Sequence, residues 1–301
     1  MQADLKDMVF SLSCMQATVK VYVIGNRFDH NLEEGEEQMS TITIDVDKCR
    51  QDGICVQACP FGVFTQTEDG TAAVVQGAET GCISCGHCIA LCPGAAITVN
   101  GMGSEDCQPV RKELQVSREQ AVQFFRSRRS IRAYKDTPVD RSILEELLDM
   151  SRWAPTAKNG QPVHWIVFQQ SRDVADLSRM VIDWMRMKNI QPNVVQAFDQ
   201  GKDIIHRNAP CLLVAHASSS GIKPVEDCTI AAATVEAAAP AFGLGACWAG
   251  FFMSAARDST PICDFLQLPE GHGVFSALML GYPKFTYRHI PPRDKLKVEW
   301  R

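Results

Sequence analysis

The chain has 301 residues, of which 46% are hydrophobic and 22% are charged, and its formal net charge is −5. This composition is typical of a soluble globular protein of about two domains. The acidic balance argues against nucleic acid and against a membrane surface as partners, since both attract a basic face. The opening residues lack the pattern of a secretory signal, and no apolar stretch is long enough to span a bilayer. With 13 cysteines, the chain is expected to work in a reducing cytoplasm.

Residues 1–40 are predicted to be an N-terminal extension. Within it, residues 17–25 are typical of a short strand, and residues 31–38 form a polar, acidic stretch that is expected to be loose. Two interpretations stay open for the extension: a segment without function, and an edge strand that packs on a neighbour.

Residues 41–103 are predicted to be a small domain that carries seven cysteines in two runs. The second run is Cys82-x2-Cys85-x2-Cys88-x3-Cys92-Pro93, and the first is Cys49-x5-Cys55-x3-Cys59-Pro60, with Asp52 where a further cysteine would stand. Strands are expected at 41–45 and 96–100, with a hairpin turn at Asp69-Gly70 between them.

Ferredoxin-type iron–sulfur binding explains both runs. In such sequences each cluster is held by about four thiolates, and the last cysteine of a run binds the other cluster. The sequence therefore predicts a 4Fe-4S cluster on Cys59, Cys82, Cys85 and Cys88, and a second cluster, 4Fe-4S or 3Fe-4S, on Cys49, Cys55 and Cys92 with Asp52 as a candidate fourth ligand. Zinc and disulfides are the alternatives. Zinc sites favour two C-x2-C pairs, however, and give no role to the Cys-Pro endings.

A linker is expected at 104–113, and the pattern changes over residues 114–301 to longer helices that alternate with apolar strands. Helices are predicted from the capping box of Ser117 and Gln120, from Asp140, and over the Ala-rich residues 225–242 up to Gly243. Strands are predicted at 164–169, 210–217 and 273–280. The expected fold class is α+β: a small iron–sulfur domain followed by a larger α+β body.

Three segments of the larger body carry the candidate chemistry. They are Arg128-Arg129-Ser130-Ile131-Arg132, residues 154–162 (APTAKNGQP), and Gly281-Tyr282-Pro283 with Arg293 further along the chain. In this order they resemble the nitroreductase family of flavoproteins. With the two cysteine runs in front, the chain from residue 41 onward resembles a ferredoxin–nitroreductase fusion protein. The resemblance implies an FMN that is bound in the interface of a homodimer.

The residue types in these segments suit FMN. Guanidinium forks match a phosphate that carries nearly two negative charges, so Arg128, Arg132 and Arg293 are candidates for it. The amide of Asn159 offers both a donor and an acceptor to the pyrimidine edge of the flavin. The family pattern implies further contacts from Arg129, Ser130, Pro155, Thr156 and Gln161, and a backbone N–H opposite flavin N5 at Ala249-Gly250. No catalytic side chain is expected, because the flavin does the chemistry.

The expected activity is FMN-dependent reduction of a small acceptor: a nitroaromatic, a quinone or an activated double bond. Electrons would enter through the clusters from a protein such as ferredoxin. The alternatives are NAD(P)H as donor with accessory clusters, an electron-transfer or redox-sensing flavoprotein without an organic substrate, and a front domain without clusters. No GxGxxG run precedes a helix, so a built-in nicotinamide domain is not expected. The seven histidines show no metal-ligand spacing and are expected to be structural or solvated.

Overall fold

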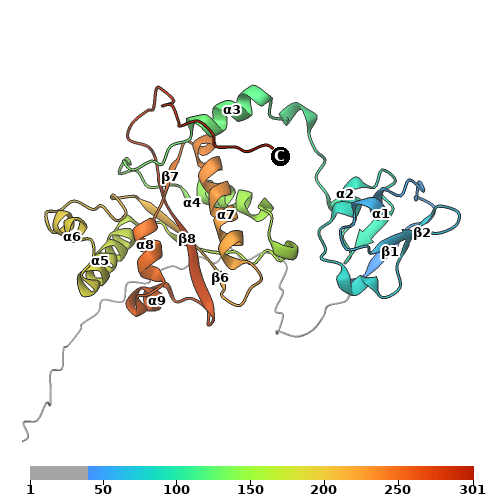
Figure 1. Ribbon diagram of the computed structural model, residues 1–301, viewed down its shortest axis with the longest axis horizontal. Helices are drawn as coiled ribbons and strands as arrows, with labels where there is room; N and C mark the ends of the chain where they lie inside the picture. The colour runs from blue at the N-terminus through green and yellow to red at the C-terminus, as the bar shows by residue number, and fades with distance from the viewer. Residues whose placement is uncertain (1–39) are drawn as a thin grey trace, which may run out of the picture.

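The computed structural model describes residues 40–301. They form a small N-terminal domain and a larger C-terminal body, which lie side by side in Figure 1. The strand expected at 17–25 and the loose stretch expected at 31–38 lie outside the described residues. Within residues 40–301, none of the helices combines the length and the apolar character that a bilayer crossing requires.

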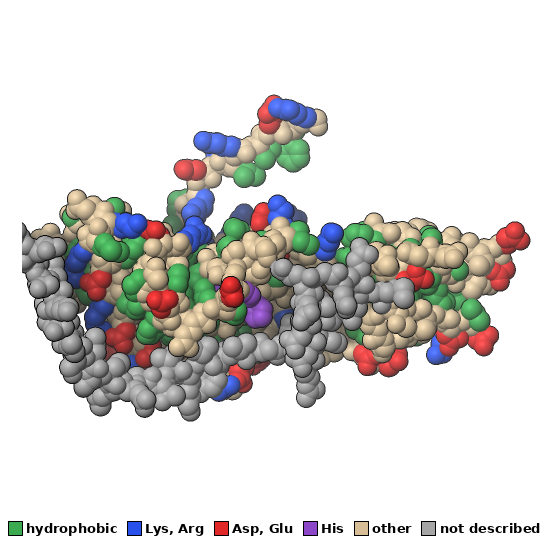
Figure 2. Space-filling model, turned by 90° about the horizontal axis from the view of Figure 1, so that it is seen from below, with side chains coloured by type: hydrophobic (Ala, Val, Ile, Leu, Met, Phe, Trp, Pro, Cys, Tyr) green, Lys and Arg blue, Asp and Glu red, His purple; other side chains and the backbone are tan. Residues whose placement is uncertain are grey.

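The small domain consists of two short strand pairs and two short helices. β1 (Ile42–Ile44) pairs antiparallel with β4 (Ile97–Val99), and β2 (Phe64–Gln66) pairs antiparallel with β3 (Ala72–Val74). The β2–β3 hairpin turns at Gly70, whose φ of 85° is a conformation that glycine adopts without strain. The two strands and the hairpin turn predicted for this domain are confirmed. Figure 2 shows acidic side chains at the end of this domain that is remote from the body.

The two helices of this domain repeat one local design. α1 (Ile54–Ala58) and α2 (His87–Leu91) each follow a left-handed glycine, Gly53 with φ 65° or Gly86 with φ 72°. Each helix ends at a cysteine that precedes a proline, because proline fits poorly in a helix interior and disfavours helical backbone at the residue before it. The domain therefore has two similar halves, each of which presents its cysteines from a loop and the short helix after it.

A four-stranded antiparallel sheet in the order β5-β6-β8-β7 forms the centre of the larger body. Its strands are β5 (His164–Phe168), β6 (Cys211–Ser218), β8 (His272–Gly281) and β7 (Gly245–Trp248). The three strands predicted for this body are confirmed. β7 is an additional edge strand, which escaped prediction because it has four residues and begins with glycine.

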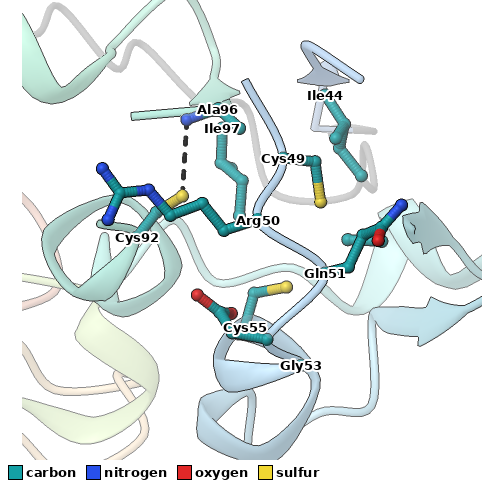
Figure 3. Close-up of a pocket in the computed structure, with 11 residues that line it drawn as sticks. Ile44, Cys49, Arg50, Gln51, Gly53, Cys55, Cys92, Ala96 and Ile97 are labelled. Atoms are coloured by element: carbon teal, nitrogen blue, oxygen red, sulfur yellow. Dashed lines mark hydrogen bonds between the residues drawn. The ribbon is translucent and has the colours of Figure 1, made fainter. Parts of the chain in front are cut away.

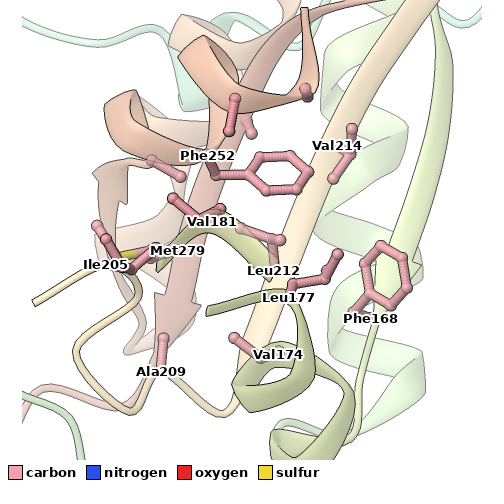
Figure 4. Packing of buried hydrophobic residues seen from close by; sticks show 14 of the residues in the cluster. Phe168, Val174, Leu177, Val181, Ile205, Ala209, Leu212, Val214, Phe252 and Met279 are labelled. Carbon is pink, nitrogen blue, oxygen red and sulfur yellow. The ribbon is translucent and has the colours of Figure 1, made fainter. Parts of the chain in front are cut away.

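Helices cover both faces of the sheet. α5 (Ser171–Lys188), α8 (Gly250–Ala256) and α9 (Thr260–Leu266) lie on one face, and α4 (Arg141–Asp149) and α7 (Pro224–Ala238) lie on the other. Side chains alternate along a strand, so Ile166 and Phe168 of β5 enter the first core while Trp165 and Val167 enter the second. Figure 4 shows the first core, where Phe252 of α8 lies near Val181 of α5.

The remaining helices are short or peripheral. α3 (Arg118–Ser127) begins with the predicted capping box: Ser117 Oγ accepts from the Gln120 N–H at 3.2 Å, and Gln120 Oε1 accepts from the Ser117 N–H at 2.9 Å. Asp140 stands at the N-cap of α4 as predicted, but its side chain makes no capping hydrogen bond. The helix predicted over 225–242 divides into α7 and a 3-10 turn that ends at Gly243 with φ 71°. The other elements are α6 (Pro192–Asp199) and the 3-10 turns Ala78–Gly81, Ser104–Asp106, Lys112–Leu114, Met150–Trp153, Ala157–Asn159 and Ala239–Phe242.

Candidate functional site

The cysteines of the small domain surround two separate cavities. The first is lined by Cys49, Cys55 and Cys92 together with Asp52, and Figure 3 shows the three sulfur atoms around it. The second is lined by Cys59, Cys82, Cys85 and Cys88. These are the two crossed sets that the spacing predicts, since each run contributes its last cysteine to the cavity of the other run.

The chemistry of these residues fits iron–sulfur clusters. All twelve described cysteines are free thiols. Within residues 40–301, no three side chains of His, Cys, Asp or Glu converge on a point where a single metal ion would be held. Thiols that are spread around a cavity fit a cluster of several irons, which binds its cysteines at different corners.

Backbone hydrogen bonds act on two of the thiols, and burial acts on a third. The Val63 N–H donates to Cys59 Sγ at 3.5 Å, and the Ala96 N–H donates to Cys92 Sγ at 3.3 Å. Such bonds stabilise the negative charge of a sulfur, and in a bound cluster they tune the reduction potential. Desolvation, together with the neighbouring Cys85 and Cys82, raises the pKa of the Cys88 thiol to about 11. Binding by Cys88 as a thiolate therefore requires a cationic centre in the cavity.

Asp52 lines the first cavity but also has a structural role. Its Oδ1 accepts a hydrogen bond from the Ile54 N–H at 3.1 Å, across the left-handed Gly53. This turn sets the start of α1, which carries Cys55. Iron ligation by Asp52 stays a prediction, with its second oxygen, Oδ2, as the atom left to serve it.

The arginine segment lies beside β7, and the chain just after it lies beside the Gly281-Tyr282-Pro283 segment. The Ile131 N–H donates to the Ala246 carbonyl at 2.9 Å, and the Lys135 N–H donates to the Tyr282 carbonyl at 2.9 Å. The structure thus brings together the first and third segments singled out in the sequence. Ser130 contacts the side chain of Cys247, and the positive charge of Arg132 acts on the same thiol.

Two arginines of this segment differ in how they are satisfied. Arg128 Nη1 donates to Glu236 Oε1 at 2.8 Å, and Trp248 Nε1 donates to the other oxygen of Glu236 at 2.9 Å. Arg129 Nη1 donates to the Arg128 carbonyl at 3.1 Å, whereas its Nη2 is buried and has no partner among the described residues. A buried guanidinium nitrogen without an acceptor is costly unless an anion binds there. Arg129 therefore fits a phosphate better than Arg128, whose charge is already paired.

The second segment forms a rigid loop at the other end of α7. Its Ala157 N–H donates to Oδ1 of the buried Asp227 at 3.0 Å, and its Gln161 N–H donates to Thr156 Oγ1 at 3.0 Å. Lys158, Asn159 and Gln161 have positive φ angles of 49°, 55° and 46°. Left-handed backbone costs a residue with a Cβ roughly 1–2 kcal/mol, so the loop holds this shape because its anchors require it.

Asn159 has hydrogen-bond partners that the sequence did not predict. Its Nδ2 donates to the Ile83 carbonyl at 3.3 Å and to the Ser84 carbonyl at 3.2 Å, in the cysteine loop of the small domain. The amide nitrogen expected at the pyrimidine edge of a flavin is therefore engaged elsewhere. No hydrogen bond to Asn159 Oδ1 is formed within residues 40–301, so the oxygen retains its capacity as an acceptor.

Backbone hydrogen bonding shows which residue, Ala249 or Gly250, can supply the N–H that is predicted to face flavin N5. The Ala249 N–H donates to the Ala277 carbonyl at 2.9 Å, which removes it from the candidates. Gly250 is the first residue of α8 and is exposed. A first-turn N–H has no partner within its own helix, so Gly250 is the remaining donor.

Other predicted residues lie apart from these contacts. Pro155 is exposed at the start of the rigid loop. Arg293 is exposed in the C-terminal arm 284–301, which has no helix or strand.

Two anchors on α7 show how far apart the first and second segments lie. Asp227 anchors the loop and Glu236 binds Arg128, and the two acids are nine residues apart on the helix. The helical rise of 1.5 Å per residue places them roughly 14 Å apart along the axis. Arg128 and Asn159 therefore lie toward opposite ends of one helix.

The structure also shows charged residues that sequence analysis missed. Asp227 and Glu236 are buried, with 3% and 9% exposure. The signal that could have revealed them is a carboxylate in an Ala-rich helix. Arg207 acts electrostatically on Tyr134 and Cys247, as Arg132 does. It adds a positive charge near the arginine segment.

Family profiles match both parts of the chain. The nitroreductase family profile matches residues 125–282, more than half of the chain, and a 4Fe-4S dicluster domain profile matches residues 41–93. The chain belongs to the nitroreductase family. With its N-terminal cluster domain, it is a ferredoxin–nitroreductase fusion protein, and the predicted α+β fold class is confirmed.

Two archaeal relatives carry the name NADH dehydrogenase/NAD(P)H nitroreductase. The protein of Archaeoglobus fulgidus is 28% identical over 169 residues, which are 55% of this chain and 87% of the relative. The protein of Methanothermobacter thermautotrophicus is 28% identical over 172 residues, which are 56% of this chain and 80% of the relative.

Solved structures share the fold of the nitroreductase body. A nitroreductase with bound FMN from Desulfitobacterium hafniense DCB-2 is 20% identical with a TM-score of 0.50, covering 59% of this chain and 96% of that chain. An FMN-dependent nitroreductase from Clostridium difficile R20291 is 19% identical with a TM-score of 0.50, covering 61% of this chain and 100% of that chain.

Proposed function

We propose that this fusion protein is an FMN-dependent oxidoreductase that takes electrons through two iron–sulfur clusters and reduces a small organic acceptor. The acceptor class is a nitroaromatic, a quinone or an activated double bond. The observation that carries the proposal is the presence, in one chain with a nitroreductase body, of two sets of cysteines that each surround their own cavity. When bound, FMN supplies hydride transfer and the clusters supply single electrons.

The described residues support an FMN site along one side of α7. The buried, unpartnered Arg129 Nη2 would take the phosphate, with Ser130 and Arg132 beside it and Arg293 reaching it from the C-terminal arm. At the other end, the rigid loop would place Thr156, Asn159 and Gln161 at the ring edge. The N–H of Gly250 would face N5, and the glycine lets the backbone approach a flat ring closely.

We propose the predicted ligand sets for the two clusters. Cys59, Cys82, Cys85 and Cys88 would hold a 4Fe-4S cluster. Cys49, Cys55 and Cys92 would hold a 4Fe-4S cluster when Asp52 completes it, or a 3Fe-4S cluster when Asp52 does not. A carboxylate is a harder ligand than a thiolate, so the Asp52 corner is the weak point of the second cluster. The many free thiols support a reducing, cytoplasmic location.

A homodimer is the proposed active unit. Large apolar side chains of α3 and the C-terminal arm are exposed: Phe125 by 68%, Leu296 by 86% and Trp300 by 91%. A second subunit that covered them would remove this apolar surface from water. Light scattering tests the proposal, and a monomer that retains FMN and activity would contradict it.

One observation favours a second candidate function, in which NAD(P)H is the electron donor and the clusters are accessory. It is the name that both archaeal relatives carry, NADH dehydrogenase/NAD(P)H nitroreductase. In this case NAD(P)H would reduce the flavin directly, and loss of the clusters would leave turnover intact.

Anaerobic stopped-flow spectroscopy separates the two candidates. The as-isolated protein, with iron, sulfide and FMN quantified, is mixed either with reduced ferredoxin or with NADPH, and the flavin absorbance is followed. The proposed function predicts fast reduction by ferredoxin and slow reduction by NADPH, followed by reoxidation with a quinone or nitroaromatic. Fast reduction by NADPH alone would establish the second candidate. A flavin that is reduced but not reoxidised by any of these acceptors would indicate an electron-transfer protein without an organic substrate.

A further inference from the structure

Among the described residues, one side chain of the nitroreductase body makes the hydrogen bonds to the cluster domain. Among the hydrogen bonds between described residues, those that join residues 41–103 to residues 114–301 are both donated by Nδ2 of Asn159. Their acceptors are the carbonyls of Ile83 and Ser84, which lie between Cys82 and Cys85. The contact therefore reaches the loop that carries two of the four ligands around the second cavity.

Both partners in this contact are also anchored by hydrogen bonds within their own domains. On the body side, the buried Asp227 binds the Ala157 N–H at 3.0 Å, and Asn159 itself is left-handed with φ 55°. On the cluster side, Ser84 is left-handed with φ 49°, and its Oγ accepts from Asn100 Nδ2 at 2.9 Å. Two constrained loops thus present a donor and two carbonyls to each other, so little conformational freedom is lost on contact.

The first cavity has no such connection. No hydrogen bond or ion pair between described residues joins the segment 49–55 to any residue beyond 113. Figure 1 shows α2, which follows the Cys82–Cys85 loop, on the side of the cluster domain that faces the body. The second cavity is therefore the inner one, and the first is the outer one.

We propose that Asn159 is a positioning residue that fixes the Cys82–Cys85 loop against the flavin-binding loop and so makes the site of Cys59, Cys82, Cys85 and Cys88 the inner, flavin-side cluster site. This rests on the proposed function. Nδ2 holds the cluster loop, while Oδ1 stays open for the acceptor role expected toward the flavin. Each transfer across this contact moves one electron and breaks no bond, and the electron comes from the one-electron donor of the proposed function.

Two variants separate the two roles of this amide. Asn159→Asp removes the Nδ2 donor but keeps an acceptor oxygen at the same place, and a carboxylate repels the two carbonyls. Asn159→Ala removes both. Asn193→Ala, at an exposed position of α6, is the matched control. Iron, sulfide and FMN contents are measured first in all four proteins, so that a loss of cofactor is distinguished from a loss of contact.

Hydrogen–deuterium exchange gives a readout that does not depend on turnover. In Asn159→Asp and Asn159→Ala, exchange in peptides that cover 82–86 and 156–161 should rise by about tenfold, because two ordinary hydrogen bonds shift the docked population by that order. Exchange in 49–55 should stay as in the wild type and in Asn193→Ala. Unchanged exchange at 82–86, or a rise in 49–55 instead, would overturn the assignment of the inner site.

Flash reduction tests the electron path in the holoprotein. Photoreduced deazariboflavin reduces the clusters, and flavin absorbance then reports transfer within the protein. In both Asn159 variants this rate should fall by about tenfold, in line with the lost docked population, while Asn193→Ala keeps the wild-type rate. A normal rate in Asn159→Asp with weakened FMN binding would overturn the proposal and leave Asn159 as a flavin ligand. A wild-type protein without any electron transfer from cluster to flavin would instead refute the proposed function. The exchange data would still show whether Asn159 holds the Cys82–Cys85 loop.

Discussion

Arg128 and Glu236 form an ion pair across 108 residues of sequence, with Nη1 and Oε1 2.8 Å apart. Trp248 binds the other carboxylate oxygen, so the acid joins the arginine segment to both α7 and β7. The pair is mostly buried. An anion that approaches Arg128 therefore competes with Glu236 for its positive charge. This ion pair limits the charge that Arg128 can offer to a phosphate. Arg129, in contrast, has a buried Nη2 without a partner among the described residues.

We expect Glu236→Gln to strengthen FMN binding by about tenfold while it destabilises the protein without FMN by about 1–3 kcal/mol. The amide keeps the shape of the side chain but releases the charge of Arg128 toward the phosphate. Fluorescence titration of FMN and thermal unfolding of the FMN-free protein measure the two effects. Glu226→Gln, which breaks the exposed pair with Lys223 on the same helix, is the control. Weaker FMN binding in Glu236→Gln would mean that the acid orients Arg128 for the phosphate.

Arg129→Ala should weaken FMN binding by about one to two orders of magnitude, because its Nη2 is predicted to make a charge-assisted bond to the phosphate. The FMN-free protein should lose little stability, since the variant also removes a buried nitrogen that lacks a partner. Arg126→Ala, at an exposed position in the last turn of α3, is the control. An FMN affinity equal to that of the wild type would show that the unpartnered nitrogen serves another purpose.

Asp52→Cys should convert the outer cluster into a thiolate-ligated 4Fe-4S cluster that resists loss of iron. Thiolate suits iron in a sulfide cluster better than carboxylate does. Electron paramagnetic resonance after the same mild oxidation should show a 3Fe-4S signal in the wild type and a smaller one in the variant. Asp52→Asn, which keeps an acceptor for the Ile54 N–H, controls for the turn before α1. Two equally resistant 4Fe-4S signals in the wild type would refute a ligand role for Asp52.

The protein should lose stability in acid through His216. Burial and the neighbouring His164 and His272 lower the pKa of His216 from 6.5 to about 4. Between these two values the unfolded chain binds more protons than the folded chain, so the free energy of unfolding falls as the pH falls through this window. The shift corresponds to about 3 kcal/mol, which is fully present above pH 6.5 and lost as the pH approaches 4.

Urea unfolding of wild type and His216→Gln between pH 7 and pH 4 measures this contribution. The variant should show a flatter dependence on pH, because a glutamine at this position does not titrate. His289→Gln, at an exposed position of the C-terminal arm, should follow the wild type. Parallel curves for wild type and His216→Gln would contradict the assignment.

Spacing along the chain was enough to predict which cysteines line each of the two cavities. The cysteines of each run are three to six residues apart, so a loop and a short helix bring all but the last of them around one cavity. The last cysteine of each run, Cys59 or Cys92, lines the cavity of the other run. β5, β6 and β8 were predictable for a similar reason, since each is a largely apolar run.

Contacts between distant residues were not predictable in this way. Asp227 reaches a backbone N–H 70 residues away, and Glu236 reaches a guanidinium 108 residues away. His164 and His216 meet because they are partners in the β5–β6 register, and His272 joins them through the β6–β8 register. Strand pairing and helix packing create these neighbours, and no local pattern of residue types records them. The partners of the Asn159 amide escaped prediction for the same reason, since they lie in the other domain.

The contact made by Asn159 has a consequence for engineering. It engages the main chain of residues 83 and 84 rather than their side chains, so many side chains at these two positions should leave it intact. A cluster domain from an unrelated two-cluster ferredoxin should therefore be able to replace residues 41–103, provided that its cysteine loop follows the same backbone path. In such a chimera, the geometry of the graft would matter more than its amino-acid identity.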